Sequence, residues 1–156
     1  MPSRPMTLRS MRLQAALLRV KLGALETTNA ARRRHADGYR AVLHGRVRLL
    51  EERPSTPCVY HLFPVRVKKR DAVAARLRAA GIETGVHYSP PLHRQPALRG
   101  LAVASGDLPR ADAWAREELS LPMSPKLTRE EVETAAEACA AAVDLERKGN
   151  RHLEPV

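Results

Sequence analysis

The chain has 156 residues, a length that fits one domain or one domain with tails. Apolar residues make up 44% of it and aromatic residues only 3%, so the core must consist mainly of leucine, valine and alanine. The formal net charge is +10, and 22 of the 27 basic residues are arginine. This charge fits either an anion-binding surface or a coding bias for arginine over lysine. The basic residues are spread along helix faces without aromatic neighbours, unlike a base-stacking nucleic-acid surface.

The cysteines, histidines and apolar runs argue against several classes of protein. Cys58 and Cys139 lie far apart without CxxC spacing, so we predict two buried, reduced thiols rather than a disulfide or a metal site. No pair of histidines has zinc spacing and no carboxylate accompanies them, so no metal ligand is predicted. No apolar run approaches membrane-spanning length, and no signal-peptide segment follows Met1. We therefore predict a soluble, cytoplasmic protein.

A long helix is predicted near the N-terminus, after a tail at residues 1–8. Residues 10–43 follow a helical period, with Gly23 as a weak point and Gly38 or Gly45 as the end. One face of this helix carries the apolar side chains of Leu13, Leu17, Val20, Leu25 and Ala31. A helix of this length on so small a domain needs a partner surface along it.

Two strands are predicted after this helix. Residues 46–52 form a short strand and residues 59–67 a longer one. Alternation along the second strand puts His61 beside Phe63 on one face, so we interpret His61 as a core residue. Pro64 places the middle of the strand at a sheet edge or a bulge, because proline donates no backbone hydrogen bond.

A further helix and strand precede a stiff loop. Asp71 is the predicted N-cap of a helix that ends at Gly81, and residues 82–87 are the next strand. The segment Gly85–Pro96 then holds two histidines, a tyrosine and three prolines. Proline fixes its own φ and restricts the residue before it, so this proline loop can hold its histidines and tyrosine in fixed directions.

The C-terminal part is predicted to alternate helix and strand. A helix that starts at residues 107–109 and runs through Glu118 precedes a strand at residues 119–123. Thr128 and Glu131 form a capping box that opens the last helix, and residues 145–156 are a charged tail. The order of elements predicts an α+β fold: a small, mostly antiparallel sheet with helices on one face and a long N-terminal helix.

Four segments, taken in order, resemble parts of one enzyme family. They are residues 9–16 (RSMRLQAA), 59–63 (VYHLF), the proline loop at 85–96, and 119–132, which begins LSLPM and ends LTREEV. Together they resemble the C-terminal part of the DegT/DnrJ/EryC1/StrS sugar aminotransferases, over about residues 6–144. The resemblance implies the small C-terminal domain of a fold-type I enzyme. It also implies an activity in which pyridoxal phosphate (PLP) serves to aminate keto sugars on nucleotides.

The resemblance also shows what the chain lacks. Family members are more than twice this long, and their first part carries the lysine that forms the Schiff base with PLP. None of the lysines here matches that position: Lys21, Lys68, Lys69, Lys126 and Lys148. Transamination needs such a lysine as covalent anchor and proton shuttle. The resemblance therefore implies PLP for the complete enzyme, no catalytic residue in this chain, and no PLP bound by the chain alone.

The resemblance implies that His87, Tyr88 and His93 help to line the nucleotide-sugar cleft. Neutral imidazole and phenol groups suit hydrogen bonds to hydroxyl and phosphate groups. The alternative for Tyr88 and His93 is that they satisfy buried backbone groups of the loop. Arg9 matches the arginine of the family's Asn-x-Arg-Met pattern, which lies near the phosphate-bearing ligands of a neighbouring subunit. The alternative for Arg9 is a solvated arginine ahead of a helix.

We therefore predict a detached C-terminal domain of a nucleotide-sugar aminotransferase, formed by residues 9–144 and inactive without a lysine-bearing PLP domain. Its expected partners are that PLP domain or a full-length aminotransferase, a nucleotide sugar, and other copies of the chain, but no membrane. Two other functions stay open. One is a non-catalytic module that docks on a full-length aminotransferase through the long helix, and the other is a basic nucleic-acid-binding protein.

Overall fold

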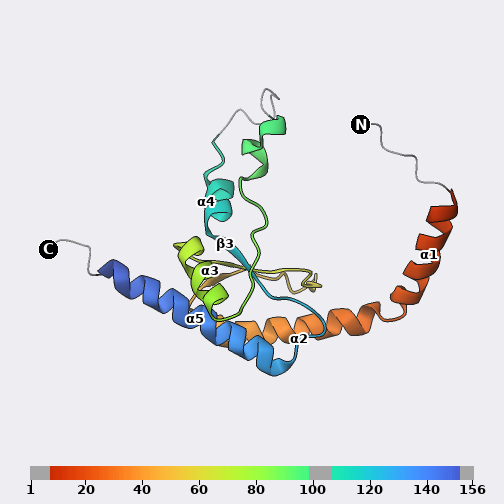
Figure 1. The fold of residues 1–156 in the computed structure, drawn as a ribbon, viewed down its shortest axis with the longest axis horizontal. Helices are drawn as coiled ribbons and strands as arrows, with labels where there is room; N and C mark the ends of the chain where they lie inside the picture. The colour runs from red at the N-terminus through yellow and green to blue at the C-terminus, as the bar shows by residue number, and fades with distance from the viewer. Residues whose placement is uncertain (1–7, 99–106, 152–156) are drawn as a thin grey trace.

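The computed structural model describes residues 8–98 and 107–151, which form an α+β fold. In chain order, the described elements are α1 (Leu8–Leu22), α2 (Leu25–Leu43), β1 (Arg48–Leu49), β2 (Phe63–Arg66), α3 (Arg70–Ala79), the 3₁₀ turns η1 (Leu92–Arg94) and η2 (Pro96–Leu98), α4 (Pro109–Glu117), β3 (Glu118–Leu121) and α5 (Arg129–Arg151). The predicted fold class is confirmed, with a small antiparallel sheet at the centre of the molecule (Figure 1).

One face of the sheet builds the hydrophobic core. The strand order is β1-β2-β3, and all pairs are antiparallel. Phe63 lies opposite Leu121 and Val65 opposite Leu119, so these four apolar side chains share one face and are buried. They pack against buried residues of α2, α3 and α5. In Figure 1, α2 and α5 run below the sheet, whereas α4 lies above it.

The opposite face of the sheet is mostly polar. It carries Pro64 and Arg66 of β2 beside Ser120 and Glu118 of β3. Helix α4 contacts this face through Arg66, whose guanidinium carbon lies 5.8 Å from the centre of the Trp114 ring. Because the core occupies the other face, any polar site built on this sheet must lie on the side of α4 and the proline loop.

Pro64 lies in the central strand, which corrects the prediction of an edge or a bulge. Its partner Ser120 directs both backbone groups toward Gly85, so the nitrogen of Pro64 faces away from β3. On that other side, β1 ends at Leu49 opposite Val65. The missing N–H of Pro64 therefore removes no hydrogen bond from the sheet.

The predicted long N-terminal helix is divided into two helices. The break falls at Gly23 and Ala24, between α1 and α2, as the weak point at Gly23 predicted. Gly45, with φ of +73°, follows the end of α2 and confirms one of the two predicted stops. All described side chains of α1, from Met11 onward, are exposed, and the helix projects away from the rest of the chain (Figure 1). The side chain of Arg9 lies outside the described residues.

The second strand is shorter than predicted because the backbone turns at Tyr60. Tyr60 has φ of +46° and is buried, whereas Val59 and His61 on either side are exposed. A left-handed residue breaks the alternation of a strand, so residues 59–62 do not continue the face of Phe63. The prediction that His61 packs in the core is therefore wrong.

Of the two predicted helix N-caps, one is wrong and one is confirmed. Helix α3 begins after Lys69, which has φ of +54°, and no side chain caps it, so Asp71 is a first-turn residue and not the N-cap. The capping box of α5 is confirmed. The Glu131 N–H donates to Thr128 Oγ1 at 3.1 Å, and the Thr128 N–H donates to Glu131 Oε2 at 2.7 Å. Helix α5 then continues to Arg151, into the segment predicted to be a tail.

Candidate functional site

The proline loop starts beside β3 because Gly85 and Ser120 form a two-bond bridge. The Gly85 N–H donates to the Ser120 carbonyl at 3.0 Å, and the Ser120 N–H donates to the Gly85 carbonyl at 2.8 Å. The rest of residues 82–87 makes no strand, which corrects the sequence prediction. The bridge carries the loop onto the polar face of the sheet, where His87 meets Glu118.

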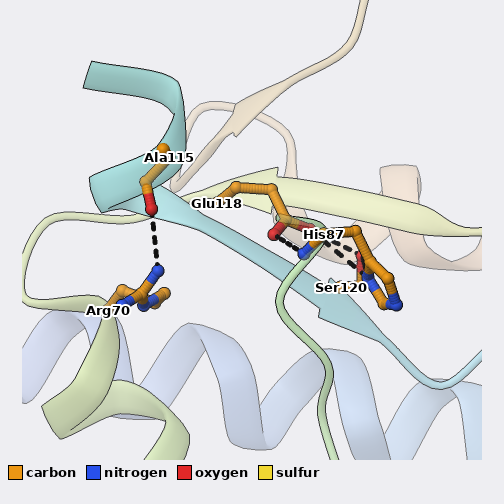
Figure 2. A network of polar contacts seen from close by, with 5 residues as sticks. All are labelled: Arg70, His87, Ala115, Glu118 and Ser120. Atoms are coloured by element: carbon orange, nitrogen blue, oxygen red, sulfur yellow. Dashed lines mark hydrogen bonds and ion pairs between the residues drawn. The ribbon is translucent and has the colours of Figure 1, made fainter. Parts of the chain in front are cut away.

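A buried carboxylate holds the start of the loop. Glu118 is 1% exposed, and its two oxygens accept two hydrogen bonds (Figure 2). The backbone N–H of His87 donates to Oε2 at 2.6 Å, and the Ser120 hydroxyl donates to Oε1 at 2.6 Å. Both oxygens are thus satisfied, as a buried carboxylate requires. Glu118 and Ser120 are two residues apart on β3, so their side chains share one face.

The imidazole ring of His87 continues this network. Its Nδ1 lies 3.0 Å from Ser120 Oγ, and its side chain keeps 27% of its surface exposed. The ring packs directly over Gly85, where a Cβ atom would lie only 2.6 Å from the His87 Cε1. Glycine at position 85 is therefore required for this position of the ring. His87 has one edge fixed by the protein and part of its ring open.

Tyr88 stands at the edge of an apolar groove. It is 73% exposed, and its ring meets that of His87 edge-on, with 5.3 Å between the centroids. The groove has a volume of about 440 Å³ and is lined by Tyr88, Pro90, Pro91, Leu92, Gln95, Ala111, Trp114 and Ala115. Because Tyr88 is so exposed, it does not satisfy buried backbone groups of the loop. Its phenol is open to a ligand.

His93 and Arg94 fasten the far end of the loop to α4. Arg94 donates to both carboxylate oxygens of Asp112, from Nε at 2.5 Å and from Nη2 at 2.7 Å. These bonds hold the pKa of the Asp112 carboxyl below its ordinary value. His93 Nε2 lies 3.2 Å from Asp112 Oδ1 without hydrogen-bond alignment, and its side chain is 11% exposed. His93 therefore packs on Asp112 and does not line the groove.

The sequence motif names His87 and Tyr88 as candidates, but it does not indicate the residues that hold His87 in place. The sequence predicts Glu118 at the end of a helix and Ser120 in an ordinary strand. A signal was present, because the sequence ELSL puts two polar residues on one face of a strand whose other face is apolar. The sequence contains no signal for the Arg94–Asp112 pair, because Arg94 of η1 and Asp112 of α4 lie 18 positions apart.

A second, larger cavity lies between residues of β1, β2 and α5. It measures about 790 Å³, and most of its polar lining is basic. Several of these cations have carboxylate partners: Arg46 with Asp144 at 2.8 Å, Arg66 with Glu117 at 2.6 Å and Lys69 with Glu146 at 3.4 Å. None of its described lining residues is aromatic. This cavity thus offers paired charges and no stacking surface for nucleic acid.

The two cysteines differ from one another. Cys139 is fully buried, as predicted, and burial raises the pKa of its thiol to about 11. Cys58 is exposed, so its predicted burial is wrong. It lies in the irregular segment between β1 and β2, where no strand carries it into the core. Among the helices of the described residues, none combines the length and apolarity needed to span a membrane.

Comparison with known proteins identifies the family. The profile of the DegT/DnrJ/EryC1/StrS aminotransferase family matches residues 6–140. The chain belongs to this family. Among its relatives, the dTDP-3-amino-3,4,6-trideoxy-alpha-D-glucose transaminase of Streptomyces venezuelae is 43% identical over 119 residues, which cover 75% of this chain and 31% of the relative.

Solved structures share the fold of this chain. S. venezuelae DesV, in complex with a ketimine intermediate, superposes with a TM-score of 0.79 and 39% identity, over 84% of this chain and 36% of DesV. An aminotransferase of the family from Brucella abortus gives a TM-score of 0.78 and 32% identity, over 83% of this chain and 35% of that enzyme. The chain thus spans about a third of the length of the relatives that it matches.

The groove beside Tyr88 offers no lysine to anchor the PLP on which enzymes of this family depend. All five lysines of the chain are exposed, and none lines the groove beside Tyr88. The Glu118–Ser120–His87 network contains no amine that could form a Schiff base with the cofactor. What the chain offers at this site is a fixed imidazole, an exposed phenol and an apolar groove, which are groups for binding and orientation.

Proposed function

We propose that the chain is the sugar-binding part of a nucleotide-sugar aminotransferase and works with a lysine-bearing PLP domain. The observation that supports this most directly is the pairing of His87 and Tyr88 within a chain of this family. His87 is fixed through Ser120, and Tyr88 stands exposed beside an apolar groove. Such a combination of an apolar wall and a few oriented polar groups is typical of small-molecule sites.

Each group has a separate task in this proposal. His87 and Tyr88 hydrogen-bond the nucleotide sugar, and the prolines with Trp114 cover its apolar faces and exclude water. Arg94 and Asp112 keep the loop against α4, so that His87 and Tyr88 are already in position before the ligand binds. Arg9 remains the candidate for a phosphate contact. PLP, when bound by the partner domain, supplies the electron sink of transamination.

We expect Tyr88→Phe and His87→Ala to weaken nucleotide-sugar binding by several-fold to a hundredfold. The loss of a neutral hydrogen bond costs about 0.5–1.5 kcal/mol and that of a bond to a charged group about 1.5–3 kcal/mol. The measurement is calorimetric titration with dTDP-glucose of a chimera, in which this chain replaces the matching segment of the S. venezuelae transaminase. Neither substitution should change the absorbance of PLP on the other domain.

The control for this experiment is His61→Ala. His61 is exposed and distant in sequence from the groove, so its loss should change neither the affinity nor the thermal melt of the chimera. If both loop variants fold and bind dTDP-glucose as tightly as the parent chimera, the loop is only a rigid connector. A chimera that folds, carries PLP and binds no nucleotide sugar would contradict the proposed function itself.

We expect the purified chain alone to form no defined aldimine with PLP. The chain would be mixed with PLP, reduced with borohydride and digested, and the labelled lysines identified by mass spectrometry. Exposed lysines should give scattered, substoichiometric labelling, because all five are open to solvent and none lines the groove beside Tyr88. One lysine labelled stoichiometrically would show that the chain carries its own cofactor site.

A second candidate function is supported by α1. Its exposed apolar side chains, among them Leu13 and Leu17 at 65% and 58% exposure, suit a module that docks on a full-length aminotransferase without taking part in the chemistry. The chimera separates the two proposals. A docking module needs α1 but not His87 or Tyr88, so nucleotide-sugar affinity would be unaffected by both loop substitutions.

A further inference from the structure

We propose that Glu118 and Ser120 are positioning residues that hold neutral His87 with its proton on Nδ1 and its Nε2 free to accept a hydrogen bond. The network therefore selects a sugar hydroxyl, and not a phosphate oxygen, as the group that His87 contacts. The identity of the ligand rests on the proposed function, whereas the position of the proton follows from the hydrogen bonds of this chain alone.

The hydrogens of the network can be placed one by one. A carboxylate at Glu118 offers only acceptors, and its Oε2 already receives the His87 backbone N–H. Its Oε1 lies 2.6 Å from Ser120 Oγ, and only the hydroxyl can supply a hydrogen to that contact. Because Ser120 has a single hydroxyl hydrogen, its oxygen faces His87 as an acceptor. The 3.0 Å contact to His87 Nδ1 must then be an Nδ1–H donation.

Burial makes this arrangement hard to reverse. Glu118 is 1% exposed and Ser120 is 4% exposed, so water cannot readily replace either partner. If Ser120 turned its hydrogen toward Nδ1, Glu118 Oε1 would face an oxygen lone pair, and a buried carboxylate would lose a bond. The hydrogen bond to Ser120 also fixes which ring edge faces it, because a flipped ring would place the Cδ2 carbon there.

The free nitrogen then decides what His87 can recognise. Within the described residues no protein group bonds to Nε2, and the ring is partly exposed. A neutral imidazole with a lone pair on Nε2 attracts a hydroxyl hydrogen and repels a phosphate oxygen, which has no hydrogen to give. The sequence allows either a hydroxyl or a phosphate group as the hydrogen-bond partner of His87. The hydrogen-bond network favours the hydroxyl.

The full-length chain, labelled with ¹⁵N-histidine, provides a direct test without any partner. Long-range ¹H–¹⁵N correlation spectra recorded at pH 8 show which ring nitrogen carries the proton. We expect His87 to be protonated on Nδ1. Exposed His61, in the same spectrum, gives the reference pattern of a freely solvated ring. A proton on Nε2 of His87 in the unaltered chain would overturn the proposal.

Glu118→Gln should reverse the tautomer. The amide oxygen must accept the His87 backbone N–H, so the NH₂ group faces Ser120 and donates to its Oγ. The Ser120 hydrogen is then released toward His87 Nδ1, and the ring proton moves to Nε2. A purely structural role for Glu118 predicts no such exchange between the two nitrogens. An Nδ1 proton retained in a folded Glu118→Gln chain would contradict the assigned network.

The ligand is tested in the chimera with a matched pair of probes, dTDP-glucose and dTDP. If His87 contacts a sugar hydroxyl, His87→Ala should weaken dTDP-glucose binding by about three- to tenfold and leave dTDP binding unchanged. If His87→Ala weakened the binding of dTDP-glucose and dTDP equally, His87 would contact a phosphate, and the assignment to a sugar hydroxyl would be overturned. A failure of the chimera to bind either ligand contradicts the proposed function but leaves the tautomer result standing.

Discussion

Leu119→Ala is expected to lower the free energy of unfolding by about 2–5 kcal/mol, the range for a large-to-small change in a well-packed core. Leu119 is fully buried in the middle of β3, opposite Val65 of the central strand, and belongs to the cluster that joins the sheet to α2, α3 and α5. Small domains are only marginally stable, so a loss of this size should unfold much of the chain at physiological temperature.

The measurement is urea denaturation followed by circular dichroism. Leu145→Ala is the matched control, because it removes the same atoms from a side chain that is 53% exposed on α5. Its effect should stay within about 0.5 kcal/mol, as for most surface substitutions. Equal losses for the two variants would mean that β3 does not pack on the helices as the structure shows.

Helix ends were predictable from the sequence where local groups fix them. The Thr128–Glu131 capping box and the glycines at positions 45 and 81 act within one turn of the backbone, and the structure has each of them at a helix end. Asp71 is not the cap because the N-cap position of α3 is Lys69, two residues earlier and in a left-handed conformation. Rules of this kind require only neighbours in the chain, which are visible in the sequence.

Strands were predicted less well because pairing depends on distant residues. Residues 59–62 have the composition of a strand, but the left-handed Tyr60 turns its own ring into the core and leaves His61 outside. Residues 82–87 keep only the Gly85 bridge, because the His87 N–H bonds to the Glu118 side chain and not to the backbone of β3. Neither the turn at Tyr60 nor the end of pairing after Gly85 has a signal in the neighbouring residues. β-propensity depends strongly on context, so it predicts a strand in both places.

The same reasoning explains what was found and missed at the candidate site. His87 and Tyr88 were named from their motif, and their roles stay predictions until the binding experiment is done. Glu118 and Ser120 were missed because their importance appears only when the loop crosses β3 and buries them. A polar pair on a short strand is usually a solvated face, and here a segment more than 30 positions away in the sequence turns it into a support for His87.

The purified chain is expected to self-associate through α1. Leu13, Leu17 and Val20 are each at least 58% exposed, and together they form an apolar stripe on α1, which projects from the fold (Figure 1). Leu25, at the start of α2, is 49% exposed. An open apolar stripe of this kind promotes association. We expect light scattering to give masses above that of the monomer, and we expect an environment-sensitive dye to bind to the apolar surface.

Replacing two leucines of the stripe should abolish that association. In the Leu13→Glu/Leu17→Glu variant the same helix turns carry charge instead of apolar surface, so the chain should become monomeric and lose dye binding. Gln14→Glu/Ala15→Glu is the matched control: it changes the net charge by the same amount on the same helix, at exposed positions off the stripe. The control should associate as the unaltered chain does. If both double variants become monomeric, the added negative charge and not the loss of the stripe prevents association. A monomeric unaltered chain that binds no dye would contradict the prediction of self-association.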